Sequence, residues 1–230
     1  MLIWVLAILG GGWLCISVSS CGKATTGSPQ LLNIQYHVIN LSPDLLPVDL
    51  FIDIRQVNST PYYFAIDQGY FYIPSTDTPY QIRSAVNTGT TWLHRDDILK
   101  SGAKYTLYIV GAVADNSLTS VLTVDTGLSP PAGMGALRLV NVSPTALGGL
   151  DVYANGTKAF SNLVYQQVSN YVNLPAGNYD LQVDATGTTT ILSEQPSVTI
   201  QNGRLYTIYA YGYSSRADSA AFATQVTRNQ

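Results

Sequence analysis

Gly102-Ala-Lys-Tyr-Thr-Leu-Tyr-Ile-Val-Gly111 decides the fold of this chain, because it recurs as Gly203-Arg-Leu-Tyr-Thr-Ile-Tyr-Ala-Tyr-Gly212. Five of the ten positions are identical, and the second copy lies 101 residues after the first (102 to 203). The same offset relates Asn40-Leu-Ser-Pro43 to Asn141-Val-Ser-Pro144. A fixed spacing between separated segments indicates a tandem duplication.

A short linker separates the two copies. Leu128-Ser-Pro-Pro-Ala-Gly-Met-Gly135 contains two prolines and two glycines within eight residues, a composition typical of linkers. We therefore place the first repeat at residues 29–127, the linker at 128–134 and the second repeat at 135–230.

Each repeat has the pattern of an all-β domain. Short alternating runs recur every eight to twelve residues between turn signals, and no window has a sustained helical period. Asn155-Gly156 is a strong hairpin signal, because both central residues of a type I′ turn need positive φ. About seven or eight short strands per repeat predict two tandem immunoglobulin-like β-sandwich repeats.

The second repeat also resembles a known family. Its Ser143-Pro144 turn is followed by a strand, Asp151-Val-Tyr-Ala, that ends in Asn155-Gly156, then by Pro175-Ala-Gly-Asn-Tyr179 and the closing Gly203–Gly212 segment. This order is similar to that of the DUF4397 domain of secreted and cell-surface bacterial proteins, over residues 136–213. The first repeat matches more loosely. The resemblance implies an extracytoplasmic β-sandwich and supplies no activity.

The N-terminus indicates export. Residues 2–18 are an apolar run without a charge, and Val18-Ser-Ser-Cys21 resembles the lipobox of bacterial lipoproteins. We expect a signal peptide at residues 1–20, lipidation at Cys21 and a tether at 21–28. The expected location is the cell envelope, lipid-anchored at the outer membrane, with the periplasmic or outer face left open. No Lys or Arg precedes the run, so an uncleaved signal anchor and an upstream start codon are the alternatives.

Composition excludes several classes of function. Charged residues make up 11% of the chain and the net charge is −3, which argues against nucleic acid as a partner. The two cysteines are Cys15, inside the apolar run, and Cys21. Removal of the first and lipidation of the second leave no thiol for a disulfide or a metal site, and we predict no cofactor.

Four polar residues are predicted to stabilise turns. Asp49 and Asp151 follow the repeated Ser42 and Ser143 by seven and eight residues, inside otherwise apolar strands. A buried carboxylate needs hydrogen-bond donors, and we expect the backbone N–H groups of the Ser-Pro turn to supply them. Calcium binding is the alternative, but the spacing lacks the D-x-D-x-D pattern.

The two histidines carry little catalytic signal. His37 lies in an alternating run, and His94 is predicted to lie in a loop near Asp96 and Asp97. No nucleophile motif accompanies either histidine, so we expect no enzyme. A hydrolase that uses His94 with Asp96 or Asp97 is the least favoured alternative.

A tyrosine row in the second repeat is the remaining candidate site. Tyr209, Tyr211 and Tyr213 share one face of their strand, because side chains alternate between faces. They could bind a sugar ring or form a protein interface, or they could simply be core. The favoured function is a non-catalytic binding or structural module of the envelope. A glycan-capturing lipoprotein is the alternative, and it requires these tyrosines to be exposed; glycans and envelope proteins are the candidate partners.

Overall fold

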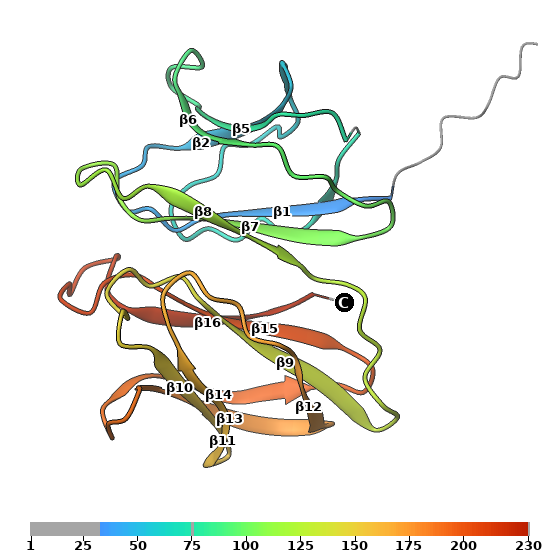
Figure 1. The fold of residues 1–230 in the computed structure, drawn as a ribbon, viewed down its shortest axis with the longest axis vertical. Coiled ribbons are helices and arrows are strands. Elements are labelled where there is room, and N and C mark those ends of the chain that lie inside the picture. The colour runs from blue at the N-terminus through green and yellow to red at the C-terminus, as the bar shows by residue number, and fades with distance from the viewer. Residues whose placement is uncertain (1–32, 75, 230) are drawn as a thin grey trace, which may run out of the picture. The chain divides into compact units, whose positions relative to one another are not determined.

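The computed structural model describes residues 33–74 and 76–229, which belong to one compact unit, Leu31–Gln230. These residues form sixteen β-strands (Figure 1). Within the described ranges, no helix has the length and apolar character needed to cross a membrane.

Each repeat contains eight strands. In the first repeat they are β1 (Gln35–Asn40), β2 (Val48–Ile52), β3 (Arg55–Gln56), β4 (Phe71–Tyr72), β5 (Tyr80–Ser84), β6 (Thr91–Arg95), β7 (Lys104–Val110) and β8 (Thr119–Val124). In the second they are β9 (Met134–Asn141), β10 (Leu150–Ala154), β11 (Thr157–Leu163), β12 (Val172–Pro175), β13 (Gly177–Ala185), β14 (Ile191–Ile200), β15 (Leu205–Tyr211) and β16 (Ala223–Arg228).

The two repeats have the same sheet topology. In the first repeat the sheets have the orders β4-β1-β7-β8 and β3-β2-β5-β6, and in the second β12-β9-β15-β16 and β11-β10-β13-β14. The parallel pairing of Gln35 with Lys104 recurs 101 residues later as Ala136 with Leu205. The register therefore reproduces the offset of the sequence repeat.

The prediction of an all-β fold with two sandwich repeats is confirmed, and the strand order refines it. In the immunoglobulin order ABED and CFG, the first strand pairs with the second. Here the first strand of each repeat lies parallel to the seventh, at the centre of its sheet. The second strand begins the other sheet.

Each sandwich has its own core, formed by alternate residues of facing strands. In the first repeat, Tyr36 and Leu107 point inward, and Tyr36 stacks on Tyr80 with ring centroids 6.0 Å apart. In the second repeat, Leu137 and Ile208 hold the corresponding positions. Burial of these apolar side chains stabilises each repeat, because apolar surface is removed from water.

The glycine that ends each copy of the repeated segment has a steric cause. Gly111 and Gly212 have φ values of 81° and 77°, which favour glycine. A Cβ atom at Gly111 would lie 2.2 Å from the Ser117 carbonyl oxygen, and one at Gly212 would lie 2.2 Å from that of Ala221. Both glycines therefore permit the close approach of the loop that leads to the last strand of the repeat.

Candidate functional site

The central strands of one sheet in each repeat are buried on both faces. Nearly every residue of β1 and β7 is buried, including those that point away from the core of the first repeat. The same is true of β9 and β15 in the second repeat. A strand that is buried on both faces must be covered on its outer face as well.

The outer residues of these strands form a third apolar core, shared by the two repeats. Its buried members are Ile39, Leu41, Tyr108 and Val110 from the first repeat and Val140, Val142 and Tyr209 from the second. Tyr108 and Tyr209 occupy equivalent positions, and their ring centroids lie 5.3 Å apart. The repeats thus meet through the same face of each, as the subunits of an isologous dimer do. We call this contact the inter-repeat interface.

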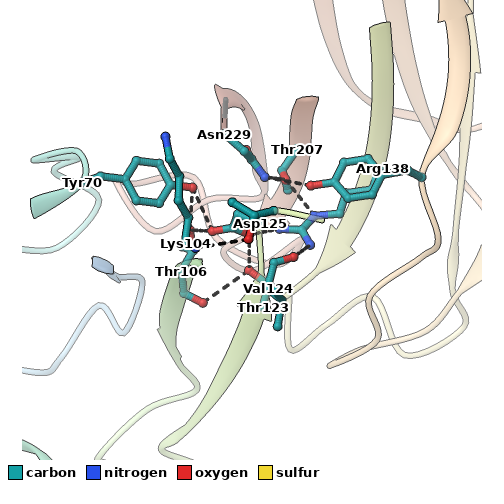
Figure 2. Close-up of polar contacts among 11 residues, drawn as sticks. Tyr70, Lys104, Thr106, Thr123, Val124, Asp125, Arg138, Thr207 and Asn229 are labelled. Atoms are coloured by element: carbon teal, nitrogen blue, oxygen red, sulfur yellow. Dashed lines mark hydrogen bonds and ion pairs between the residues drawn. The ribbon is translucent and has the colours of Figure 1, made fainter. Parts of the chain in front are cut away.

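A buried ion pair crosses the inter-repeat interface. Arg138 of β9 pairs through Nη2 with the Asp125 carboxylate, which follows β8 (Figure 2). The two side chains are 4% and 0% exposed. Arg138 also donates from Nη1 to the Val124 carbonyl (2.8 Å) and from Nε to Thr207 Oγ1 (2.9 Å). The guanidinium therefore binds two groups of the first repeat while remaining attached to its own sheet.

Asp125 is fully supplied with donors. Its Oδ2 accepts hydrogen bonds from Thr106 Oγ1 (2.6 Å) and the Tyr70 hydroxyl (2.8 Å), and Oδ1 accepts one from Thr123 Oγ1 (2.8 Å). Burial and the neighbouring Asp125 carboxylate raise the pKa of Tyr70 above its ordinary value, so its hydroxyl stays protonated and donates. A buried carboxylate with this many partners is compatible with a stable fold.

Groups of the second repeat also contact the Arg138 guanidinium. Its guanidinium lies 5.0 Å from the centre of the Tyr171 ring, within cation–π range. With its amide oxygen turned toward these groups, Asn229 accepts hydrogen bonds from the Thr207 hydroxyl (2.8 Å), the Tyr171 hydroxyl (3.0 Å) and Arg138 Nη2 (3.3 Å).

Some equivalent positions of the two repeats carry different charges in this network. The backbone N–H of Asp125 donates to Lys104 O, and that of Asn229 donates to Leu205 O, each at 2.8 Å, so the two residues correspond. The equivalent pairs are Tyr70 and Tyr171, Thr106 and Thr207, Asp125 and Asn229, and His37 and Arg138. The tyrosines and threonines are the same in both repeats, whereas the carboxylate and the guanidinium each occur once. The duplicated face therefore carries complementary charges only when the first repeat meets the second.

The predicted tyrosine row lies largely in this interface. Tyr209 is 1% exposed and its hydroxyl donates to Gln225 Oε1, while Tyr211 and Tyr213 are half-buried. Burial raises the pKa of all three hydroxyls. The exposure that the glycan-binding alternative requires is absent at Tyr209, because the first repeat covers it, and Tyr209 instead lies in an interface, the other role considered for this face.

The Ser-Pro turns are held by a residue that the sequence analysis did not single out. Asn40 Oδ1 accepts the backbone N–H of Ser42, and Asn141 Oδ1 accepts that of Ser143, each at 3.1 Å. The hydroxyl of Ser143 donates to Gly212 O at 2.7 Å. The repeated asparagine was visible in the sequence as the first residue of the N-x-S-P pattern.

The predicted partners of Asp49 and Asp151 are wrong. Asp49 accepts a hydrogen bond from Asn58 Nδ2 (2.7 Å) rather than from the turn. Asp151 accepts bonds from Lys158 Nζ (2.6 Å), the Asn162 backbone N–H (2.8 Å) and Thr186 Oγ1 (2.8 Å). Both carboxylates tie the second strand of the repeat to the segment that follows it. The strand register supplies the donors of Asp151, because Leu150 beside it pairs with Leu163 and Ala185, the neighbours of Asn162 and Thr186.

The environment of Asp151 favours its charged form. Burial of the carboxyl raises its pKa, but the bonds from Lys158, Asn162 and Thr186 outweigh this effect and lower the pKa to about 2. Asp151 is therefore ionised throughout the physiological range and acts as a structural acceptor.

Both histidines pair with carboxylates. His37 is buried, and its Nε2 lies 2.7 Å from Asp67 Oδ1. His94 lies in the edge strand β6 rather than in a loop, and its Nε2 is 3.0 Å from Asp96 Oδ2 on the exposed surface. Asp97 instead pairs with Arg95. The described residues include no group of three His, Cys, Asp or Glu side chains placed to hold a metal ion. Cys21 lies outside the described residues.

The fold and the shared core define a two-repeat β-sandwich protein whose repeats meet face to face. Residues 35–148 and 145–230 each match the model of a family described as a domain of unknown function, DUF4397. Together the matches cover well over half of the chain, which therefore belongs to the DUF4397 family and contains two copies of its domain. No curated protein matches the chain.

Proposed function

We propose that this chain is a lipid-anchored protein of the cell envelope whose two repeats act together as a non-catalytic binding or structural module. The proposal that the two repeats act together is supported by the inter-repeat interface, with its apolar core and the buried Arg138–Asp125 pair. A covered interface of this kind favours two domains that move as one body over two that tumble on a linker.

The anchor rests on the N-terminal sequence. Val18-Ser-Ser-Cys21 follows an uncharged apolar run, which is the arrangement of a lipoprotein signal. A lipidated Cys21 would place the module at a membrane surface, and the outer membrane is the membrane we propose.

A non-catalytic role is supported by how the polar side chains are used. The carboxylates that the sequence marks as candidates, Asp49 and Asp151, bind backbone and side-chain donors of their own sheet. The histidines bind Asp67 and Asp96. These groups are engaged in the fold, which favours a role in binding or architecture. The alternative of sugar capture by Tyr209 loses its basis, because Tyr209 is buried.

Mass spectrometry of the chain expressed in a bacterium tests the anchor. We expect a membrane-bound product that begins at an acylated Cys21 and that is lost in Cys21→Ala. Cys15→Ala is the matched control, because Cys15 lies in the segment that we expect to be removed, and it should leave the acylated product unchanged. A product that retains residues 1–20 would contradict the proposal.

A substrate test addresses the non-catalytic role. The purified chain is incubated with envelope peptidoglycan, phospholipid and polysaccharide, and we expect no turnover. Turnover that His94→Ala abolishes would overturn this part of the proposal and favour a hydrolase.

A further inference from the structure

Three apolar side chains are exposed near one end of the first repeat, two of them in the repeat and the third at the start of the linker. Ile98, in the loop between β6 and β7, is 91% exposed, and Val124, at the end of β8, is 52% exposed. Leu128, just beyond β8, is also exposed. Single exposed apolar residues are common, but residues from separate segments that gather at one end indicate a contact surface.

Ile98 and Val124 border the same hollow in the surface. It has a volume of about 630 Å³ and is also lined by Leu99, Tyr105 and Leu122. Tyr105 pairs with Val124 across β7 and β8, so the loop and the end of β8 lie together. The lining also includes the polar residues Asp97, Lys100, Ser101 and Thr126, and the exposed apolar side chains at the rim are suited to contact apolar groups of a partner.

This end of the repeat is also where the first strand begins. The backbone N–H of Gln35 donates to Ala103 O at 3.0 Å, and Ala103 lines the hollow. Gln35 is paired with Lys104, the first residue of β7. The described part of the chain therefore begins, at the start of β1, beside the exposed apolar residues.

The length of the segment from Cys21 to Gln35 limits how far this end can lie from an anchor. Between Cys21 and Gln35 there are about 14 residues, which span at most about 50 Å when fully extended. As a flexible coil, a segment of this length has an end-to-end distance of about 20 Å. An anchor at Cys21 would therefore hold the end that carries Ile98 close to the bilayer, whereas the far end of the sandwich is one strand length further away.

We infer that this end of the first repeat, where Ile98 and Val124 border the hollow and Leu128 follows the lining residue Gly127, docks onto the lipid bilayer. The inference rests on the proposed lipid anchor. Burial of these side chains among the lipid headgroups and upper acyl chains removes apolar surface from water, and a tether makes even a weak contact effective. Docking would fix which end of the two-repeat module faces the membrane.

The test measures whether position 98 enters a bilayer. The chain from Gly22 to Gln230 has no cysteine and includes the whole compact unit Leu31–Gln230, so one engineered cysteine can be labelled with a polarity-sensitive nitrobenzoxadiazole dye. Ile98→Cys is labelled, and the chain is attached by an N-terminal His tag to phosphatidylcholine vesicles that contain nickel-chelating lipid. Val86→Cys is the matched control, because Val86 is 74% exposed and follows Ser84, the last residue of β5. The first residue of β5, Tyr80, pairs with Arg95 next to the loop that carries Ile98, so Val86 lies at the other end of the strand.

We expect a blue shift and an increase in dye emission at position 98 on attachment, and no change at position 86. Val124→Asp, a substitution at an exposed edge, should reduce the change at position 98. An unchanged spectrum at position 98, or equal changes at both positions, would overturn the docking surface. Because the His tag replaces the lipid, failure here leaves acylation of Cys21 untouched, and failure of acylation leaves this result standing.

Discussion

Removal of the Arg138 guanidinium would leave the Asp125 carboxylate buried without its ion-pair partner. Breaking a buried ion pair from one side costs about 3–5 kcal/mol, because the remaining charge stays in a medium of low polarity. Asp125 keeps three donors, Thr106, Thr123 and Tyr70, so we expect a value near the lower end. For Arg138→Met, which retains the apolar stem, the free energy of unfolding should fall by about 3 kcal/mol.

A double-mutant cycle separates the pair from the packing of its stem. Asp125→Asn alone should also destabilise the protein, because it leaves Arg138 charged and buried. The double variant, Arg138→Met with Asp125→Asn, should be more stable than the sum of the two changes predicts, by about 2 kcal/mol. Urea unfolding measures these values through the fluorescence of Trp92, which is the only tryptophan outside the first 20 residues.

Arg216→Met provides the matched control. The Arg216–Asp218 pair is exposed on both sides, so its loss should leave the urea midpoint unchanged. A small effect of Arg138→Met, below about 1 kcal/mol, would refute the reasoning, because it would mean that the pair is solvated. Strictly additive effects in the double variant would refute it as well.

Three further predictions concern single positions. Tyr209→Ala should lower the free energy of unfolding by about 3 kcal/mol, because it opens a cavity in the shared core, while Tyr63→Ala at an exposed site should change it by less than about 0.5 kcal/mol in the same urea assay. Gly212→Ala should lower the melting temperature, since its Cβ would lie 2.2 Å from the Ala221 carbonyl oxygen; Gly177→Ala, where a Cβ meets no atom within 4 Å, should leave it unchanged, and equal effects would contradict this steric account. Because the pKa of Asp151 is lowered to about 2 in the folded state, its contribution is present above about pH 4 and is lost between about pH 4 and 2. Asp151→Asn should therefore destabilise the protein more at pH 6 than at pH 2 in chemical denaturation, and a loss that does not depend on pH would contradict the assignment.

The sequence was sufficient to predict the repeat and its fold class. The offset of 101 residues reappears in the parallel register of Gln35 with Lys104 and of Ala136 with Leu205. Alternation and turn residues report local structure, so they predicted short strands and a sandwich. They could not predict the sheet order, because the pairing of the first strand with the seventh depends on contacts far apart in the chain.

The inter-repeat interface was not predicted, although a signal for it was present. In the segment Tyr105–Val110, apolar or aromatic residues occupy both odd and even positions, which is typical of a strand buried on both faces. Alternation alone assigns one face to the core and leaves the other open, so the pattern predicts a ligand or interface face at Tyr209 without indicating that the first repeat is the partner. Arg138 and Asp125 gave no such signal, because a single charge in a strand is normally solvated and their proximity depends on how the repeats meet.

The hydrogen-bond partners of the repeated aspartates, Asp49 and Asp151, could not be predicted from the sequence either. A carboxylate within a strand was correctly expected to need donors, but its neighbours across the sheet are set by register. Asp151 thus accepts hydrogen bonds from Lys158, Asn162 and Thr186 rather than from the Ser-Pro turn. The chain distance of seven or eight residues to the serine did not correspond to a contact.

Differential scanning calorimetry of the chain from Gly22 to Gln230 tests most directly whether the two repeats form one body. Because the third core and the Arg138–Asp125 pair join them, we predict a single transition in which the calorimetric enthalpy equals the van't Hoff enthalpy. Two separate transitions, or a calorimetric enthalpy about twice the van't Hoff value, would show that the repeats unfold independently and would contradict the account.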